Sequence, residues 1–283
     1  MSDSLSLDAH CHLHWSNSKV SDMAQTEETL QDKKMSDMAQ AGKTLQDKRV
    51  SDMDSFGAFI NTVAPKEFEE AKHQIKETEN IKIGLGLHPW YVEECDVREF
   101  QTYLPQTRFI GEIGLDFSKK FSVEEKETQV EVFETLCEMI AKTPYTGKTP
   151  QEQRVSDMVS CNNEKVSDMR IISVHTCKTH GKTHEILKQS GVIENSIVIY
   201  HWFGDDEVTL KEAIDDGCLF SVNARMLSSK KGLALAGKIP KEQLLFETDM
   251  PKAKDDVWTL QDSEQSIILT WQKLMKMENV TSK

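Results

Sequence analysis

Short apolar segments recur along the chain, and most are bounded by turn residues or by a stretch of helical periodicity. Apolar runs of about four to eight residues that are rich in β-branched side chains are typical of buried strands. Eight segments have this character: 5–12, 56–63, 81–88, 108–116, 170–175, 196–201, 217–223 and 243–249.

Polar segments with an apolar stripe separate several of these runs. Residues 65–80 (PKEFEEAKHQIKETEN) and 123–142 (VEEKETQVEVFETLCEMIAK) place Phe, Val, Leu and Ile on one side of a helix. Alternation of strand and helix, repeated about eight times, favours parallel strands joined by helical crossovers. The count of eight favours a closed TIM-type (β/α)8 barrel over an open sheet.

Repeats interrupt this pattern in two places. A unit of 15 residues beginning at Lys19 recurs in tandem from Lys34, and the pentapeptide (R/K)VSDM returns at Arg49, Arg154 and Lys165. A solenoid would repeat through the whole chain, and this chain does not.

The polar repeats are typical of insertions in surface loops, and proteins tolerate insertions at such places well. We therefore predict one domain over 1–283 with insertions at about 17–52 and 145–169. A partner-binding role for the repeats is the alternative.

Composition narrows the class of protein. A length of 283 residues suits one barrel, and the net charge of −13 excludes a broad basic surface for nucleic acid. An anionic substrate would then need local compensation, for which metal ions are the natural means. The six cysteines form no C-x-x-C pair, and the chain has neither a signal peptide nor a long apolar run. These features predict a cytoplasmic protein that does not associate with membranes.

Histidines and carboxylates mark the ends of many predicted strands. In a barrel, these ends lie on one rim, where loops assemble the active site. The residues concerned are His10, His12, His88, Glu112, His175, His201 and Asp249. Side chains distant in the sequence would thus converge on one point.

The DAHCH segment places His10 and His12 on the same face of a strand, since side chains alternate with a period of two. Two imidazoles arranged in this way can bind one divalent ion, whereas Cys11 points to the opposite face. His175 and His201, each taken singly, are more often interpreted as buried neutral histidines that are satisfied by a hydrogen bond. Together with the H-x-H pair they favour a metal site.

Carboxylates complete the predicted site. Glu112 in GEIGLDF can bridge two metal ions, and its apolar neighbours argue against a surface turn. Asp249 in FETDMP can ligate a metal and accept a proton from a nucleophilic water. Asp116 either caps a loop or supports a ligand through a hydrogen bond. Glu247 either faces the same site or pairs within the barrel.

Four further histidines have other expected environments. His88 precedes Pro89, which holds the chain extended, and we interpret His88 as facing the substrate. His73, His180 and His184 lie in helix or loop sequence and are expected to be exposed. Neither a G-x-S-x-G elbow nor a P-loop occurs in the sequence.

Six motifs, in this order, resemble the TatD family of metal-dependent deoxyribonucleases within the amidohydrolase superfamily. They are DAHCH, GLHPW, GEIGLDF, SVH, YHWFG and LLFETDMP, and the resemblance runs from about Leu5 to Pro251. It implies a TIM-type barrel with two divalent ions (Mg²⁺, Mn²⁺ or Zn²⁺) and exonuclease-type cleavage of DNA.

The resemblance also implies roles for individual residues. His10, His12 and Asp249 would hold one ion, Glu112 would bridge, and His175 and His201 would hold the second ion. His88 would contact the scissile phosphate, and Asp249 would act as general base.

Three departures from the family pattern stand out. Lys178 follows the SVH motif where an Arg-rich turn is usual, so we expect Lys178 to supply the substrate-binding charge. The repeats replace the connection where a first helix would lie. The segment after FETDMP has one helix-like stretch, which predicts a shortened C-terminus.

We therefore predict a deoxyribonuclease that takes DNA, preferably single strands or ends, and is a monomer or weak oligomer. The first alternative is a barrel hydrolase acting on an amide, lactone or aminoacyl ester. The second is a metal-binding remnant without turnover.

Overall fold

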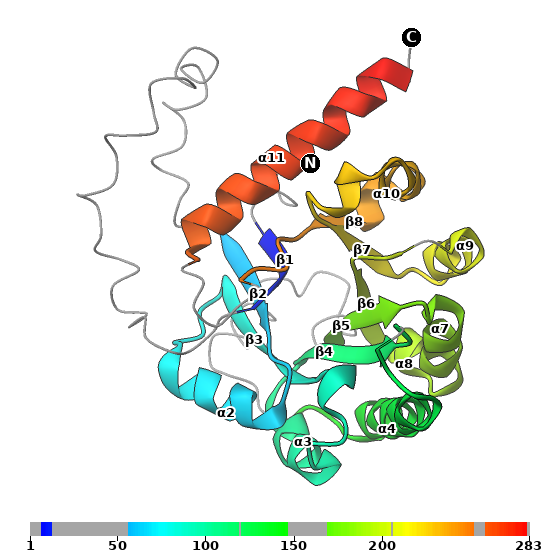
Figure 1. Cartoon of the computed structure of the whole chain (residues 1–283). Coiled ribbons are helices and arrows are strands. Elements are labelled where there is room, and N and C mark those ends of the chain that lie inside the picture. Colours follow the sequence, from blue (N-terminus) through cyan, green and yellow to red (C-terminus); the bar gives the residue numbers. More distant parts are fainter. Residues whose placement is uncertain are drawn as a thin grey trace, which may run out of the picture.

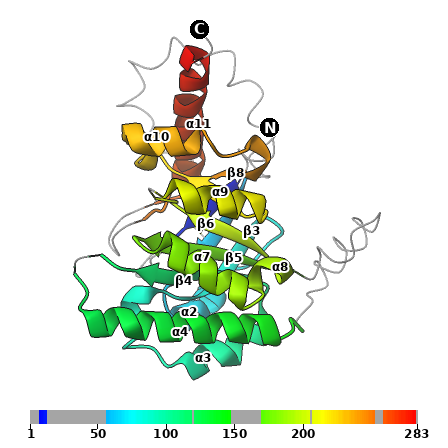
Figure 2. The same cartoon turned by 90° about the vertical axis from the view of Figure 1, so that its right-hand side faces the viewer.

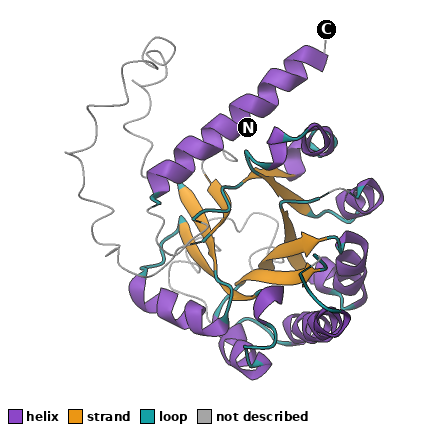
Figure 3. Cartoon of the chain, in the orientation of Figure 1, coloured by secondary structure: helices purple, strands orange, loops and turns teal. Residues whose placement is uncertain are grey.

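The computed structural model describes residues 7–12, 56–118, 120–146, 169–204, 206–251 and 258–281. In this part of the chain, eight parallel strands follow one another around a barrel in the order β1 to β8 (Figures 1 and 3). The strands are β1 (Leu7–Cys11), β2 (Gly57–Asn61), β3 (Ile81–Leu87), β4 (Phe109–Asp116), β5 (Arg170–Cys177), β6 (Ser196–His201), β7 (Leu219–Val222) and β8 (Leu244–Phe246). The prediction of a TIM-type barrel is confirmed.

Helices lie on the outside of the strands and connect most of them (Figures 1 and 2). The α-helices are α2 (Pro65–Gln74), α3 (Val97–Tyr103), α4 (Val123–Lys142), α7 (His180–Gln189), α8 (Val192–Asn195), α9 (Glu207–Asp215), α10 (Lys230–Ala236) and α11 (Leu260–Thr281). Short 3₁₀ helices are η4 (Pro89–Tyr91), η5 (Leu104–Gln106), η6 (Met226–Ser228) and η7 (Lys241–Gln243). Among the described helices, none is both long and apolar enough to cross a lipid bilayer.

The helix predicted over 123–142 forms with those bounds. Its N-cap Ser122 makes a reciprocal capping box with Glu125, which satisfies backbone donors at the first turn. The inner face buries Phe133 among the core side chains. Gln129, on the same face, accepts a hydrogen bond from the Asp116 backbone at 2.9 Å, so α4 fixes the end of β4 as well as covering it.

The segment that follows β8 closes the barrel against β1. Asp249 N donates to His10 O at 3.0 Å, and His12 N donates to Met250 O at 2.8 Å. The Asp8 carboxylate adds to this seam by accepting from Thr248 N at 3.0 Å. The β1–β8 seam therefore lies directly beside the residues predicted to bind metal.

The predicted strand over 243–249 is longer than the observed β8. The ladder ends at Phe246, and Asp249 takes a left-handed backbone with φ of 54°. The predicted insertions at 17–52 and 145–169 lie almost wholly outside the described residues, so their boundaries stay predictions. The single helix-like stretch expected after FETDMP is α11.

Buried Arg170 joins the amino-terminal side of β5 to the neighbouring layer. Its guanidinium donates to the carbonyl oxygens of Leu104 (3.0 Å), Thr107 and Thr143 (2.8 Å). These carbonyl groups lie at helix ends, next to η5 and at the C-terminal end of α4. A single side chain thus satisfies three backbone groups where two helices end.

We expect Arg170→Met to lower the free energy of unfolding by about 3 kcal/mol, because it leaves buried carbonyls without donors. Urea denaturation followed by circular dichroism measures the change. The matched control is Arg98→Met, which removes an exposed guanidinium from Asp96 and should leave the midpoint unchanged. Equal stabilities of the two variants would contradict this role for Arg170.

Candidate metal centre

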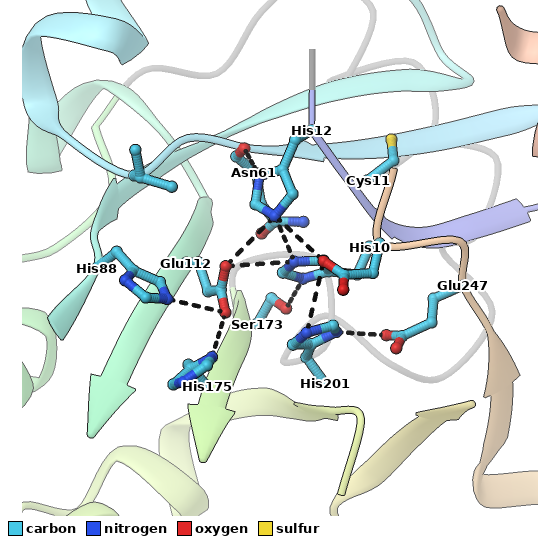
Figure 4. Close-up of polar contacts among 12 residues, drawn as sticks. His10, Cys11, His12, Asn61, His88, Glu112, Ser173, His175, His201 and Glu247 are labelled. Carbon is cyan, nitrogen blue, oxygen red and sulfur yellow. Dashed lines mark hydrogen bonds and ion pairs between the residues drawn. The ribbon is translucent and has the colours of Figure 1, made fainter. Parts of the chain in front are cut away.

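Six side chains predicted as metal ligands converge at one mouth of the barrel. Figure 4 shows five of them pointing toward a common centre, with Glu112 between two sets of imidazoles. They are His10 on β1, His12 directly after β1, Glu112 on β4, His175 on β5, His201 at the end of β6 and Asp249 after β8. Their convergence follows from the barrel, which brings the carboxyl ends of its strands to one rim.

His10 and His12 face one another as the H-x-H spacing predicts. Their Nε2 atoms are 3.2 Å apart, and they lie 3.4 and 3.5 Å from Glu112 Oε2. Cys11, between them, packs into the hydrophobic core instead. The strand alternation therefore separates the site-facing imidazoles from the core-facing thiol.

Hydrogen bonds fix which nitrogen of each imidazole faces the centre. His12 Nδ1 is 2.9 Å from the Asn61 carbonyl oxygen, which can only accept. The proton of neutral His12 therefore lies on Nδ1, and the lone pair lies on the Nε2 atom that faces Glu112. A neutral imidazole held in this way is ready to bind a metal.

His201 is oriented by the same device. Its Nδ1 lies 2.7 Å from Glu247 Oε2, and its Nε2 lies 3.8 Å from Asp249 Oδ1. Glu247 also accepts from Ser221 Oγ and, at 2.7 Å, from Asn223 Nδ2. Glu247 was predicted either to face the site or to pair within the barrel. Its contacts with His201, Ser221 and Asn223 show that it pairs within the barrel.

His88 presents the opposite tautomer. Its Nδ1 accepts from Trp90 N at 3.2 Å, so the proton of the neutral ring lies on Nε2. That Nε2 is 3.5 Å from Glu112 Oε1. Burial lowers the pKa of His88 to about 4, which keeps the ring neutral. The site therefore has an N–H donor at this position, suited to an acceptor oxygen.

His175 lies between two carboxylates. Its Nδ1 is 2.8 Å from Glu112 Oε1, and its Nε2 is 3.3 Å from Asp116 Oδ2. Burial alone would lower the pKa of His175, but the hydrogen bonds to Asp116 and Glu112 raise it to about 9. Asp116 also accepts from Ser118 N at 2.8 Å, so it both caps the loop and supports His175.

The carboxylates of the centre stay ionised. Burial alone would raise the pKa of Glu112, but the neighbouring His88 and His10 lower it well below its usual range. Burial likewise opposes ionisation of Asp249, but His201 and His12 outweigh it and lower the pKa of Asp249. Two buried carboxylates therefore face one space, and they in turn raise the pKa of His175 to about 9 and that of His201 to about 10 against the effect of burial, so that protonated imidazoles balance them. A bound cation could take over this role.

The spacing of the donor atoms fits a divalent cation. Ligand atoms about 2.1 Å from a tetrahedral or octahedral ion lie roughly 3.0–3.4 Å from one another. The contacts of 3.2, 3.4 and 3.5 Å among His10, His12 and Glu112 are close to this spacing. Imidazole nitrogens and carboxylate oxygens also match the preferences of Zn²⁺ and Mn²⁺.

The candidate ligands form three overlapping sets, with the donor atoms of each set within 4.8 Å of one another. The sets are His10–His12–Glu112, His10–His201–Asp249 and His88–Glu112–His175. All six predicted ligands belong to at least one set. His175 and His201 fall in different sets, with ring centroids 6.4 Å apart. Their assignment to one shared ion stays a prediction.

Three supporting residues were not identified from the sequence. Ser173 Oγ lies 2.7 Å from His10 Nδ1, Asn61 O holds His12, and Asp8 accepts from His10 N at 3.3 Å. Asp8 precedes His10 by two residues, so the alternation of the strand was an available signal. The contacts of Ser173 and Asn61 join different strands, and no local pattern indicates them.

Lys178 directly follows β5 and is exposed, with φ of 60°. This position places it on the same rim as His175. Its role in binding substrate stays a prediction.

The expectation that His180 and His184 are exposed is wrong, whereas His73 is exposed. His180 Nε2 accepts from Gly204 N at 2.9 Å, and a Cβ at Gly204 would come within 2.6 Å of the His180 ring. His184 bonds to Tyr200 Oη at 2.9 Å and to Asp216 Oδ2 at 3.1 Å. Both histidines lie on the inner face of α7, where packing against β6 and its loop buries them.

We expect His184→Leu to destabilise the fold by about 2 kcal/mol without changing metal affinity, because it leaves the buried Tyr200 hydroxyl without this partner. Urea denaturation and metal titration of the same sample measure both effects. His73→Leu, on an exposed face of α2, is the matched control. A change in metal affinity with unchanged stability would contradict a purely structural role for His184.

The fold and the cluster together define a (β/α)8-barrel protein with a histidine and carboxylate centre of the kind that holds divalent cations. The family model for TatD related DNase matches residues 7–144 and 167–283, and the chain belongs to this family. The match is interrupted between these two spans.

Individual relatives are distant in sequence. The chain is 23% identical over 203 residues to a protein of Danio rerio named "Putative deoxyribonuclease tatdn3", and the match covers 70% of this chain. It spans 65% of that relative, slightly less than two thirds of its length.

Two crystal structures share the fold. One is YJJV, a TatD homologue from Escherichia coli K12, with a TM-score of 0.60 and 16% identity, covering 96% of this chain and 90% of that chain. The other is a hydrolase TatD family protein from Entamoeba histolytica, with a TM-score of 0.53 and 17% identity, covering 78% and 77%. At these identities, the likeness concerns the fold.

Proposed function

We propose that this protein is a metal-dependent hydrolase that cleaves DNA phosphodiester bonds as an exonuclease, with two divalent ions. One observation carries the proposal: the two oxygens of Glu112 face different sets of imidazoles. Oε2 is 3.4 Å from His10 and 3.5 Å from His12, and Oε1 is 2.8 Å from His175. A carboxylate shared in this way is suited to bridge two cations. Family membership supports DNA as the substrate.

The ligand set divides around this bridge. His10, His12 and Asp249 would hold one ion, while His175 and His201 would hold the other. When bound, the ions supply Lewis-acid activation of the scissile phosphate and of the attacking water. Mg²⁺, Mn²⁺ and Zn²⁺ are all compatible with the oxygen and nitrogen donors.

Asp249 is the proposed general base. Its carboxylate stays ionised beside His201 and His12, and its left-handed backbone directs it into the mouth from the end of β8. His201, fixed by Glu247 through its Nδ1, presents its Nε2 to the centre at 3.8 Å from Asp249 Oδ1, as its predicted role as a metal ligand requires. A proton from the attacking water can therefore be accepted at Asp249 Oδ1.

His88 is the proposed phosphate contact. Its neutral Nε2–H donor faces the centre beside Glu112, so it can donate to a non-bridging phosphate oxygen. Lys178 on the same rim would add positive charge to the substrate path. Neither residue needs to bind a metal for this role.

The test uses labelled single-stranded DNA with Mg²⁺, Mn²⁺ or Zn²⁺ added to metal-free protein. Metal content measured on protein purified without chelators identifies the resident ions. We expect release of terminal nucleotides only when a divalent ion is present. A parallel panel contains an amide, a lactone and an aminoacyl ester.

Two outcomes would contradict the proposal. Turnover restricted to the carbonyl compounds would assign the site to another bond. Stoichiometric metal binding without hydrolysis of any ester would indicate a remnant that binds metal without turnover. The preference for single strands or ends, the monomeric or weakly oligomeric state and the cytoplasmic location stay predictions from the sequence.

A further inference from the structure

A tryptophan lies exposed beside the metal centre. Trp90 is 48% exposed, although it is held firmly: its Nε1 donates to Asp116 Oδ2 at 2.7 Å. Its ring stands nearly perpendicular to His88, with centroids 5.2 Å apart. Asp116 in turn contacts His175. The centre thus fixes the position of a large apolar ring that remains open to solvent.

A cation covers part of this ring. Lys120 Nζ lies 2.9 Å from the centroid of Trp90, and Lys120 is itself exposed. The attraction of an ammonium to an indole face explains the pairing. This arrangement places a positive charge over one face of an indole ring that is still 48% exposed at the mouth.

A second pair of the same kind lies beside His201. The Trp202 ring is 6.4 Å from His201 in an edge-on arrangement, and the guanidinium of exposed Arg225 lies 5.2 Å from the Trp202 centroid. Trp202 adopts a φ of 41°, which is sterically unfavourable for a bulky side chain. Two tryptophan–cation pairs therefore adjoin the centre, one next to His88 and the other next to His201.

This combination matches the chemistry of an unpaired nucleotide. Aromatic rings stack on bases without regard to sequence, and neighbouring cations follow the phosphate backbone. The chain has a net charge of −13, so cations placed beside an acidic centre offset repulsion where a phosphate must approach. A base within a duplex cannot present its face in this way.

We propose that Trp90 is the stacking site for the base next to the scissile phosphate, with Lys120 contacting the adjoining backbone. The Trp202–Arg225 pair receives a base on the other side of the centre. This inference rests on the proposed function and deepens it, because it names the side chains that would hold the bases on the two sides of the scissile phosphate.

The experiment measures binding of a fluorescent thymidine oligonucleotide in EDTA, so that turnover plays no part. The comparison is an oligonucleotide of the same length with tetrahydrofuran abasic sites. We expect Trp90→Ala to raise the Kd for the thymidine strand about tenfold and to leave the Kd for the abasic strand nearly unchanged. Trp90→Phe, which keeps a ring but lacks the N–H to Asp116, should restore most of the preference for bases.

The charge contribution is tested separately. Lys120→Ala should raise the Kd for both oligonucleotides and reduce the salt dependence of binding. Lys142→Ala is the matched control, since Lys142 is exposed on α4 and pairs with Glu138. Circular dichroism verifies that each variant is folded.

Equal Kd values of wild type and Trp90→Ala for the thymidine strand would overturn the proposal, as would equal losses for both strands. A failure of the proposed function has a different signature. In that case wild-type protein with Mg²⁺ or Mn²⁺ cleaves neither strand, whereas the binding comparison still tests the stacking site.

Discussion

Replacement of Glu112 with Gln is expected to lower kcat for DNA cleavage by about 10³-fold or more. The Glu112 carboxylate faces His10 and His12 through one oxygen and His175 through the other. An amide has the same shape but lacks the negative charge, so it cannot bridge two cations. Loss of several kcal/mol of charge stabilisation corresponds to this change in rate.

The same variant should bind metal at least about tenfold more weakly, since loss of even an indirect ligand contact has an effect of that order. Isothermal titration with Mn²⁺ measures affinity and stoichiometry, and single-turnover cleavage measures the rate. Glu127→Gln on the exposed face of α4 is the matched control. Undiminished cleavage by Glu112→Gln would remove the basis of the proposed two-ion site.

Replacement of Asp249 with Asn is expected to reduce kcat by about 10²- to 10⁴-fold, the usual contribution of a positioned base. Asn is chosen because it tolerates the left-handed φ of 54° at this position, whereas Ala would add backbone strain. The substitution therefore tests the charge of the side chain with little change in the fold.

Metal concentration separates the two roles of Asp249. A residue that only bound metal would be compensated by excess Mn²⁺, and kcat would recover. A general base would not, so we expect kcat to stay low at saturating metal. Full recovery would contradict the assignment of the base. Asp215→Asn, exposed on α9, is the matched control.

The strands of this barrel were predictable because parallel strands are buried on both faces and therefore form continuous apolar runs. All eight runs correspond to strands. The predicted boundary of a strand differs from the observed one where the predicted segment runs on to a polar residue beyond the last paired residue, as at Asp249. Dihedral angles at such points depend on tertiary contacts, here the hydrogen bonds between the segment after β8 and the end of β1.

The candidate ligands were predictable for a related reason. Strand alternation and the geometry of a barrel rim together place the six predicted ligands, which come from the ends of five strands, at one mouth. The supporting contacts depend on partners far away in the sequence: Ser173 and His10 are 163 residues apart. The burial of His184 was missed because it depends on Tyr200 and Asp216, which packing rather than helical periodicity brings close.

Trp90 illustrates the same limit. It belongs to the GLHPW motif, yet sequence alone assigned it no role. Its exposure, its bond to Asp116 and its contact with Lys120 are properties of the assembled rim. A chemical role for such a residue can be inferred only once its neighbours in the structure are known.

The closing seam of the barrel has a consequence for how the protein is synthesised and folds. His10 lies near the beginning of the described chain and Asp249 near its end, and they meet across β1 and β8. A nascent chain on the ribosome therefore carries the first two imidazoles long before the last carboxylate has been synthesised. The cation centre can be completed only after β8 and the segment behind it have emerged and docked, so the proposed nuclease activity would arise only at the end of folding.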